Sequence, residues 1–256
     1  MIKISAALAV FNEEKNLRSC LESVQDLADE IVIVDGGSSD TTLEIAKEFD
    51  AKIIKTNNPP NFHINKNKAI EASSGDWILQ LDADEVVSEE LAREVKKTIS
   101  KKTDINGYWI PRRNFFLGRF LEKGGQYPDY TLRFYKKGFG KLPAEDVHEQ
   151  ARVSGKVGYL KNDLLHQRDK SLSSYMERFN RYTDLFAGQL RQKNVKKNFF
   201  SAFDYFFTKP ILWFIKAYLR HKGFVDGFPG FVFALFSSLR FPVAYLKFWS
   251  NHESSN

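Results

Sequence analysis

Short apolar runs alternate with amphipathic segments through the first hundred residues. Four runs are bounded by glycine or polar residues and are typical of buried strands: residues 2–10, 30–34, 51–55 and 77–81. Apolar residues between the first two runs recur at helical spacing: Leu17, Cys20, Leu21 and Val24. Strands that alternate with helices pair in parallel through right-handed crossovers. The pattern therefore predicts an α/β, Rossmann-like half with a mostly parallel central sheet.

Polar residues follow these predicted strands, and we expect them to share one edge of the sheet. Asn12, Asp35 and Asp82 each lie at or just beyond the end of an apolar run. In open α/β sheets ligands bind at the carboxyl ends of the strands, because the loops that leave those ends form the crevice. Asp82 and Asp84 can place two carboxylates near one divalent cation, and such oxygen ligands suit Mg²⁺ or Mn²⁺. The apolar run at residues 77–81 ends directly before Asp82, which favours a metal site over a solvated turn.

Asp35 is followed by Gly36 and Gly37, a placement like that of the acids that hydrogen-bond a ribose or base in nucleotide-binding folds. A simple turn is the alternative reading of this tripeptide. The sequence contains neither a G-x-x-x-x-G-K-[ST] loop nor a G-x-G-x-x-G motif. These absences argue against an NTPase and against a dinucleotide enzyme.

Size and charge narrow the class of protein. The chain has 256 residues, enough for one large domain or a domain with an appendage, and a formal net charge of +6. This charge favours acidic partners such as phosphates or anionic lipid heads, but is too small to indicate nucleic acid. The single Cys20 excludes an internal disulfide and fits a reducing compartment. Residues 2–10 are expected to form a first strand rather than a signal peptide.

The last third of the chain changes to helical and aromatic patterns. From Ser171 onward apolar residues recur at helical spacing, and residues 191–197 form a basic hinge before a phenylalanine-rich region. Charged residues and prolines are expected to interrupt every apolar stretch before it could span a bilayer: Lys209, Pro210, Asp226, Pro229, Arg240 and Pro242. Helices of this composition favour attachment to the membrane interface. A helical cap or an oligomer contact that buries these aromatic side chains in protein is the alternative.

Three motifs together resemble the family 2, GT-A-fold inverting glycosyltransferases. They are residues 10–14 (VFNEE), 34–42 (VDGGSSDTT) and 75–85 (GDWILQLDADE). A narrower likeness is to the bacterial branch that adds glucose or similar sugars to the lipopolysaccharide inner core. It rests on residues 127–135 (YPDYTLRFY), 147–149 (VHE), 165–166 (LH) and 223–227 (GFVDG).

The resemblance implies roles on the donor side of the site. Asn12, Glu13 and Asp35 are expected to hold the uracil and ribose of a nucleotide sugar, most simply a UDP-sugar. Asp82 and Asp84 would handle the metal and the diphosphate. Lys66 or Lys68 occupies the basic position of the family that can meet a phosphate, unless these lysines belong to a solvated helix face.

The same resemblance implies the remaining catalytic groups. The base that takes the proton of the acceptor hydroxyl is expected at Glu149, with Asp146 as the alternative. The non-catalytic interpretation of this stretch is a charged surface loop. His166 would complete the metal site, although a lone histidine is often structural. Arg133 is expected to meet a phosphate or an acceptor acid, or else to be a charge on a strand surface.

Together these inferences predict a metal-dependent inverting glycosyltransferase that moves a hexose to a lipid-linked saccharide at the cytoplasmic face of the bacterial inner membrane. Residues 1–170 would form the GT-A catalytic domain, with a nucleotide-sugar half at 1–100 and an acceptor half at 101–170. Residues 171–256 would form a helical, membrane-associating extension. The rival functions are a sugar-nucleotide nucleotidyltransferase and a non-catalytic membrane-binding protein with a degenerate transferase domain.

Overall fold

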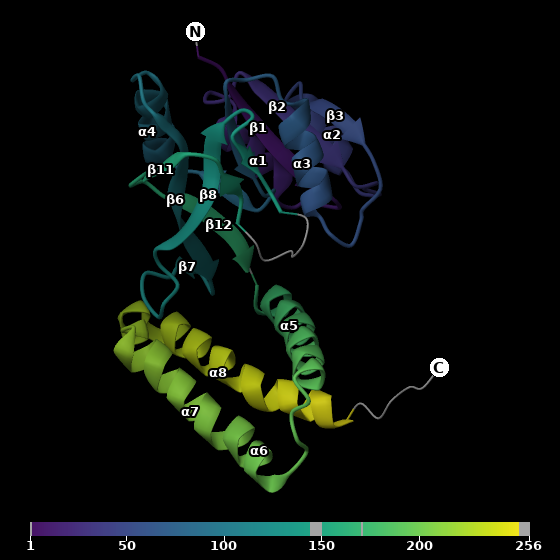
Figure 1. Ribbon diagram of the computed structural model, residues 1–256, viewed down its shortest axis with the longest axis vertical. Helices are drawn as coiled ribbons and strands as arrows, with labels where there is room; N and C mark the ends of the chain where they lie inside the picture. Colours follow the sequence, from purple (N-terminus) through teal and green to yellow (C-terminus); the bar gives the residue numbers. More distant parts are fainter. Residues whose placement is uncertain (1, 144–149, 170, 251–256) are drawn as a thin grey trace. The chain divides into compact units, whose positions relative to one another are not determined.

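Strand β1 (Ile4–Val10) is the buried centre of the parallel part of the sheet. It pairs in parallel with β2 (Glu30–Asp35) on one side and with β4 (Trp77–Leu81) on the other. Strand β3 (Lys52–Lys55) extends the row beyond β2, again in parallel. The predicted parallel half is therefore confirmed, in the strand order β3-β2-β1-β4 (Figure 1).

Alternate residues of β1 enter two different cores, because successive side chains of a strand point to opposite faces. Leu8 packs in one core with helices α1 (Leu17–Val24) and α2 (Thr42–Glu48). Ala7 packs in the other core with α3 (His63–Ala72). Helices thus cover both faces of the parallel strands, which is the doubly wound arrangement that the sequence predicts.

The sheet continues beyond β4 with strands of mixed direction. Strand β8 (Asp129–Lys136) pairs antiparallel with β4, and β6 (Ile105–Phe116) pairs antiparallel with β8. The row ends with β12 (Leu164–Asp169) and β5 (Glu85–Val87), which pair antiparallel with each other. The central sheet is parallel in its first half and mixed in its second.

Short elements complete this part of the chain. Helix α4 (Glu89–Ile99) begins after Ser88, whose Oγ accepts a hydrogen bond of 3.2 Å from the backbone N–H of Leu91. This is the helix start that the sequence Ser88-Glu89-Glu90 indicates. The remaining strands are two to four residues long: β7 (Arg119–Phe120), β9 (Gly140–Lys141), β10 (Arg152–Val153) and β11 (Lys156–Tyr159).

The computed structural model describes residues 2–143, 150–169 and 171–250. The chain divides into two compact units. The first unit, here the sheet unit, contains Met1–Arg112 and Asp129–Gln167. The second, here the helical unit, contains Arg113–Pro128 and Arg168–Asn256. The helical unit thus includes a segment from the middle of the sequence, which the aromatic composition of the C-terminal third does not indicate.

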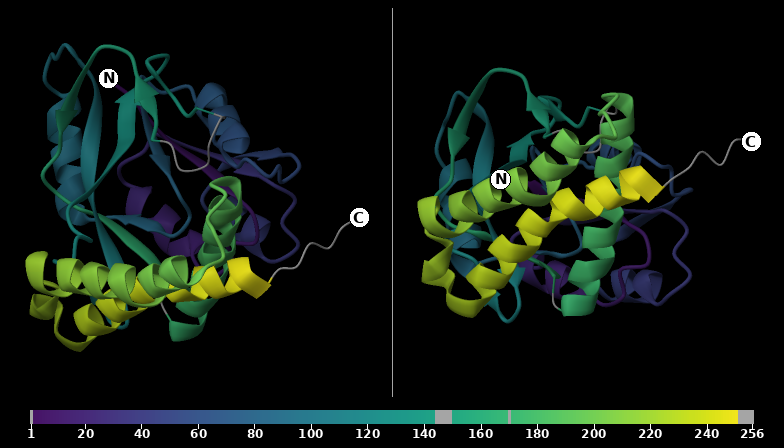
Figure 2. Two further views of the ribbon diagram at one scale, coloured as in Figure 1. Left: turned by 60° about the horizontal axis from the view of Figure 1, so that its bottom comes forward. Right: turned by 90° about the horizontal axis from the view of Figure 1, so that it is seen from below.

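The C-terminal part of the helical unit has two long helices, α5 and α8, and a series of short helical segments between them. Its elements are α5 (Leu172–Gln192), α6 (Phe199–Phe203), a π-helical turn (Asp204–Thr208), α7 (Lys209–Phe214), a second π-helical turn (Ile215–Arg220), a 3₁₀ turn (Gly223–Asp226) and α8 (Gly227–Ser250). Figure 1 shows α6 and α7 as one continuous rod beside α8, and the two views of Figure 2 agree. Tyr205 and Trp213 of this rod pack against Tyr245 and Phe241 of α8.

The prolines do not interrupt these helices as the sequence predicts. Pro210 is in the first turn of α7, where a missing N–H costs little, and Pro229 is in the first turn of α8. Pro242 lies inside α8, which continues to Ser250. One stretch in the described part of the chain, Gly223–Ser250, is therefore long and apolar enough to cross a membrane, by length and composition only. Eight of the α8 residues are buried, as in the core helix of a bundle.

Candidate functional site

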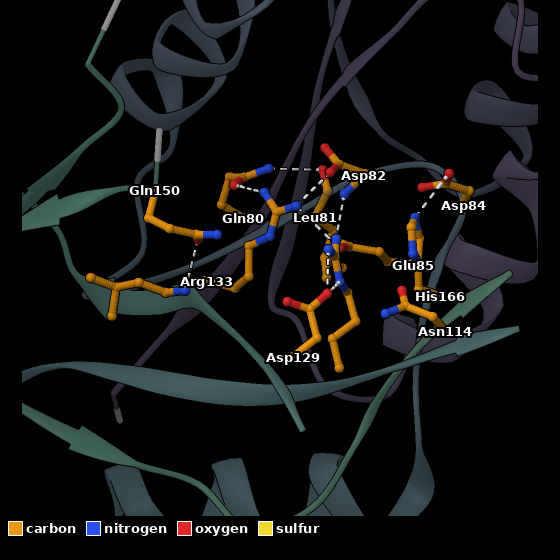
Figure 3. A network of polar contacts seen from close by, with 12 residues as sticks. Gln80, Leu81, Asp82, Asp84, Glu85, Asn114, Asp129, Arg133, Gln150 and His166 are labelled. Atoms are coloured by element: carbon orange, nitrogen blue, oxygen red, sulfur yellow. Dashed lines mark hydrogen bonds and ion pairs between the residues drawn. The ribbon is translucent and has the colours of Figure 1, made fainter. Parts of the chain in front are cut away.

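Asp82 follows the last residue of β4, and both of its carboxylate oxygens meet cations. Lys66 Nζ of α3 pairs with Oδ1. Arg133 Nη2 of β8 pairs with Oδ2 (Figure 3). Lys66 and Arg133 are both buried. Burial alone would raise the pKa of the Asp82 carboxyl, but Arg133 and Lys66 hold that pKa well below its usual range. Asp82 therefore stays ionised and is the shared counterion of two buried cations.

The guanidinium of Arg133 is divided among groups of its own chain. Its Nη1 donates to the side-chain oxygen of Gln80, and its Nη2 donates to Asp82 and, over 3.1 Å, to Glu85 Oε1. Burial alone would lower the pKa of Arg133, but Asp82 and Glu85 raise it above its ordinary value. Among the described residues its buried Nε has no hydrogen-bond partner. Arg133 is thus not the strand-surface charge that one reading of the sequence allows.

Glu85 is fully buried in β5 and joins the turn after β4 to strands β6 and β8. Its Oε2 accepts a 2.9 Å hydrogen bond from the backbone N–H of Asp82, and its Oε1 accepts from Arg133 at 3.1 Å and from Arg112 at 3.2 Å. Arg112 Nη2 then reaches Asp129 Oδ2 at 2.7 Å (Figure 3). This network fixes the turn after β4 to strands β5, β6 and β8.

Asp84 and His166 lie side by side. Asp84 Oδ2 is 3.3 Å from His166 Nε2. The backbone explains the approach, because β12 pairs with β5 so that His166 faces Glu85, and the N–H of Gln167 donates to the carbonyl oxygen of Asp84 at 2.8 Å. His166 is 8% exposed. The structure therefore unites two of the three predicted metal ligands, while the third, Asp82, faces Lys66 and Arg133.

Asn12 and Asp35 shape one loop at the carboxyl edge of β1 and β2. The Asp35 carboxylate accepts hydrogen bonds of 3.1 Å from the backbone N–H groups of Gly37 and Ser38. Asn12 has a left-handed backbone, with φ of 54°, and its Oδ1 accepts from the N–H of Ser39 at 2.8 Å. Asp35 is 1% exposed. The structure therefore brings these two predicted nucleotide-binding residues to one loop, which both of them order.

Glu13 and Gly36 complete the same edge. The N–H of Glu13 donates to Thr42 Oγ1 at 2.8 Å, and Glu13 Oε2 accepts from Asn16 at 2.9 Å. A Cβ on Gly36 would lie 3.1 Å from Cβ of Asn58, so the loop packs closely there. The edge that the sequence assigns to the nucleotide is thus built from short, tightly spaced turns.

The two candidate lysines of α3 have different environments. Lys66 is 7% exposed, so the solvated helix face expected as its alternative is wrong. Burial lowers the pKa of the Lys66 ammonium, and Asp82 offsets part of that effect. Lys68 is exposed and donates to Thr56 Oγ1 at 2.8 Å, and the N–H of Thr56 donates to the carbonyl oxygen of Asp35. Lys66 therefore belongs to the Asp82 network and Lys68 to the Asp35 loop.

Asp146 and Glu149, the two candidate bases, lie outside the described residues, but the chain on either side of them is firmly held. Asn67 of α3 makes two hydrogen bonds to the backbone of Leu142, at 2.8 and 3.0 Å. His63 Nδ1 is 2.7 Å from the carbonyl oxygen of Pro143. On the far side, Gln150 Oε1 accepts from the N–H of Leu132, next to Arg133, at 3.3 Å (Figure 3). Helix α3 and strand β8 thus anchor the chain before and after the acid-rich segment.

A comparison with protein families matches the model described as glycosyl transferase family 2 over residues 5–149. The chain belongs to this family. A relative from Rhizobium meliloti, described as lipopolysaccharide core biosynthesis glycosyltransferase LpsC, is 27% identical over 98% of this chain and 93% of the relative. An uncharacterized glycosyltransferase of Rickettsia typhi is 28% identical over 91% of this chain and 82% of the relative.

Among solved structures, residues 1–349 of S. aureus TarS match this family 2 chain with a TM-score of 0.48 and 14% identity. The match covers 96% of this chain and 92% of the TarS chain. A TM-score below 0.5 does not establish a common fold, so membership of family 2 rests on the family model alone.

The family 2 resemblance implies a divalent cation, and the side chains at the end of β4 fit one in part. Among the described residues no three His, Cys, Asp or Glu side chains form a cluster that could hold a metal. Asp84 and His166 supply one oxygen and one nitrogen, donors that Mn²⁺ accepts, and such ions commonly take further ligands from phosphates and water. Asp82 does not fit as a ligand, because its oxygens already face Lys66 and Arg133.

Sequence reasoning missed several polar residues of this family 2 chain that hold the site together: Gln80, Glu85, Arg112 and Asp129. One signal was visible. Gln80 stands inside the apolar run of β4, and a polar side chain in a buried strand requires a partner. Glu85 lies in the motif of residues 75–85, yet nothing in its spacing shows that it is more deeply buried than Asp84.

Proposed function

We propose that the sheet unit transfers a hexose, glucose or a related sugar, from a UDP-sugar to a lipid-linked saccharide, with inversion at the anomeric carbon. The observation that carries the proposal is the pair Asp84 and His166, 3.3 Å apart beside the Lys66-Asp82-Arg133 cluster. This arrangement sets a potential cation site next to buried positive charge at the carboxyl end of a central strand, where α/β sheets bind ligands. A divalent cation and nearby positive charge are both needed to neutralise the diphosphate of a nucleotide sugar.

The donor would lie along the edge formed by β1, β2 and β4. The loop ordered by Asn12 and Asp35 would receive the uracil and ribose, with Glu13 behind it. Lys68, the exposed lysine near that loop, would meet a phosphate directly. Lys66 would act through Asp82, whose charge it balances. A divalent cation held by Asp84 and His166 would neutralise the charge that develops on the leaving diphosphate.

The reaction is a single displacement. The acceptor hydroxyl oxygen forms a bond to the anomeric carbon as the bond from that carbon to the diphosphate oxygen breaks. The diphosphate leaves with the electron pair, and the hydroxyl proton passes to a carboxylate, Glu149 or, as the alternative, Asp146. Attack opposite the leaving group inverts the anomeric configuration. The anchors on Leu142, Pro143 and Gln150 would hold the carboxylate's segment relative to α3 and β8.

The acceptor would be lipopolysaccharide core, as the name of the Rhizobium relative suggests. A lipid-borne acceptor places the enzyme at the cytoplasmic face of the inner membrane, attached peripherally through the helical unit. The helical unit is rich in exposed apolar side chains, which supports that location.

A donor screen tests the proposed reaction. The purified chain is incubated with a panel of nucleotide sugars, core oligosaccharide and either Mn²⁺ or Mg²⁺, and release of nucleotide diphosphate is measured together with the anomeric configuration of the product. We expect release with at least one UDP-hexose and an inverted linkage. Pyrophosphate release from a nucleoside triphosphate and a sugar phosphate would identify a nucleotidyltransferase instead. No release from any donor would support a non-catalytic protein.

A further inference from the structure

An exposed apolar row runs along the rod formed by residues 199–220. Six residues spaced four apart make up the row, and 45 to 77% of each is exposed: Phe199, Phe203, Phe207, Ile211, Ile215 and Leu219. We refer to these six residues as the apolar stripe. Phe200 and Leu212, 81 and 61% exposed, lie beside it in sequence. Exposed aromatic and aliphatic side chains at this density on one helix mark an interaction surface.

The π-helical turns explain why a four-residue repeat forms a stripe. In a regular α-helix each step of four residues turns by about 40°, so six such residues would wind about 200° around the axis. The two π-helical turns, Asp204–Thr208 and Ile215–Arg220, fall within the stripe. A π-helical turn closes with i→i+5 bonds and therefore holds more residues, which reduces that winding. Tyr205, Pro210 and Ala217 of the rod are buried instead.

Positive charge gathers around the stripe. Residues 191–226 contain eight Lys and Arg but two Asp, a net charge of +6 that equals the formal charge of the entire chain. Both acids are paired, Asp204 with Lys209 and Asp226 with Arg119. Four of the basic residues precede the rod, at 191, 193, 196 and 197, and Arg220 and Lys222 stand at its far end. The apolar stripe is therefore flanked at both ends by cations.

We propose that the apolar stripe inserts into the interface of an anionic bilayer, with the rod lying in the plane of the membrane and the flanking cations at the lipid phosphates. This surface deepens the membrane location proposed above and rests on it, but its test does not require catalysis. A lipid surface matches both features at once, since apolar side chains enter the acyl boundary and Lys and Arg meet anionic head groups. Asp204, Lys209 and Lys216 within the rod oppose a spanning orientation.

Two lysines within the rod, Lys209 and Lys216, direct their ammonium groups toward rings on the side that packs on α8. Lys209 Nζ lies 4.1 Å from the ring centre of Tyr205, and Lys216 Nζ lies 5.1 Å from that of Trp213. Tyr205 and Trp213 belong to the side of the rod that packs on α8. These two lysines thus fold back toward the protein side of the rod, and the stripe itself consists of apolar residues alone.

Flotation with vesicles of two compositions tests the proposal. Full-length protein is mixed with vesicles of phosphatidylcholine, or of phosphatidylcholine with phosphatidylglycerol, and the fraction that floats is measured. We expect binding to the anionic vesicles, weakened by high salt, and a loss of about tenfold or more in the triple variant Phe203→Ser, Phe207→Ser, Ile211→Ser. Leu185→Ser with Leu246→Ser is the matched control, because these leucines are 53 and 54% exposed but lie outside the stripe.

A variant with fewer flanking cations tests the role of charge separately from that of the apolar stripe. Lys193→Gln, Lys196→Gln and Arg220→Gln together are expected to reduce the preference for anionic over neutral vesicles. Lys96→Gln with Lys101→Gln, exposed lysines of the sheet unit, are expected to leave it unchanged. Circular dichroism confirms that each variant is folded.

The proposal is overturned if the wild-type chain does not float with anionic vesicles, or if the stripe variant floats as well as the Leu185/Leu246 control. A concentration-dependent dimer that the stripe variant abolishes, without flotation of the wild type, would show that a second copy covers the stripe. Release of nucleotide diphosphate from a UDP-sugar, measured without vesicles, is expected to be equal in wild type and stripe variant. A failure of membrane binding is therefore distinct from a failure of the proposed reaction.

Discussion

Asp84 Oδ2 lies 3.3 Å from His166 Nε2, although the two residues are far apart in the sequence. The antiparallel pairing of β12 with β5 creates this contact, because it places His166 opposite Glu85, the residue after Asp84. The strands β2 and β4 end at the same edge of the sheet, with β1 between them, so Asp35 is at the same edge as this pair. Adjacent strands are about 4.8 Å apart, which separates the ends of β2 and β4 by about 10 Å.

Replacement of Asp84 tests its role as a metal ligand. We expect Asp84→Asn to keep the fold and to reduce transfer by on the order of 100-fold or more, since a cation at the diphosphate contributes several kcal/mol of charge stabilisation. His166→Gln is expected to raise the Mn²⁺ concentration needed for half-maximal rate. Both variants are measured by nucleotide diphosphate release over a Mn²⁺ titration, with His221→Gln, an exposed histidine of the helical unit, as control. Full metal-dependent turnover in Asp84→Asn would rule out the assignment.

The low pKa of Asp82 predicts a pH-dependent contribution to stability. A carboxyl whose folded pKa is depressed stabilises the fold above its unfolded pKa of about 3.9, and this contribution is lost as pH falls through the folded value. Asp82→Asn leaves Lys66 and Arg133 without their shared counterion, which is expected to cost on the order of 3 kcal/mol at neutral pH. Urea unfolding at pH 7 and at lower pH measures the difference.

The difference in free energy of unfolding between wild type and Asp82→Asn should be full at pH 7 and should shrink below about pH 4. Asp26→Asn, an exposed acid of the same unit, is expected to change stability by less than about 0.5 kcal/mol at either pH. A constant difference across the pH range would show that the Asp82 charge is not the source of the effect.

Asn67 is expected to position the acid-rich segment rather than to bind a substrate. Its amide makes two hydrogen bonds with the backbone of Leu142, and Asn67→Ala would leave both backbone groups without that partner. We expect a stability loss of about 1–3 kcal/mol and a fall in kcat with little change in the KM for the donor. Asn67→Asp, which keeps one acceptor, should recover part of kcat. A change confined to the donor KM would contradict a positioning role.

Local sequence patterns predict the parallel half of the sheet and its site edge well. Leu17, Cys20, Leu21 and Val24 are all buried on α1, as their spacing indicates. The spacing of apolar residues and the turn residues suffice to predict this half, because each strand is followed by its own crossover helix. The mixed half depends on long-range pairing, such as β8 with β4, and no local pattern encodes its register.

In the site, too, local sequence predicts some features, while others depend on long-range contacts. The Asp-x-Asp motif locates the turn after β4, but it does not distinguish Asp82, which neutralises Lys66 and Arg133, from Asp84, which meets His166. That distinction depends on which side chains the neighbouring elements supply, and these come from α3, β8 and β12. Burial of Glu85 is likewise a property of the closed sheet and not of the motif.

The choice between Glu149 and Asp146 as base is open to a direct kinetic test. If Glu149 takes the acceptor proton, Glu149→Gln should lower kcat at saturating donor by about 100-fold or more, the usual contribution of a general base, and leave the donor KM near its wild-type value. Asp146→Asn should then have a much smaller effect, and the reverse order would assign the base to Asp146. Glu122→Gln, an acid of the helical unit, serves as control. If neither Glu149→Gln nor Asp146→Asn slows transfer, the base lies outside this segment, and the anchors at Leu142, Pro143 and Gln150 serve the fold alone.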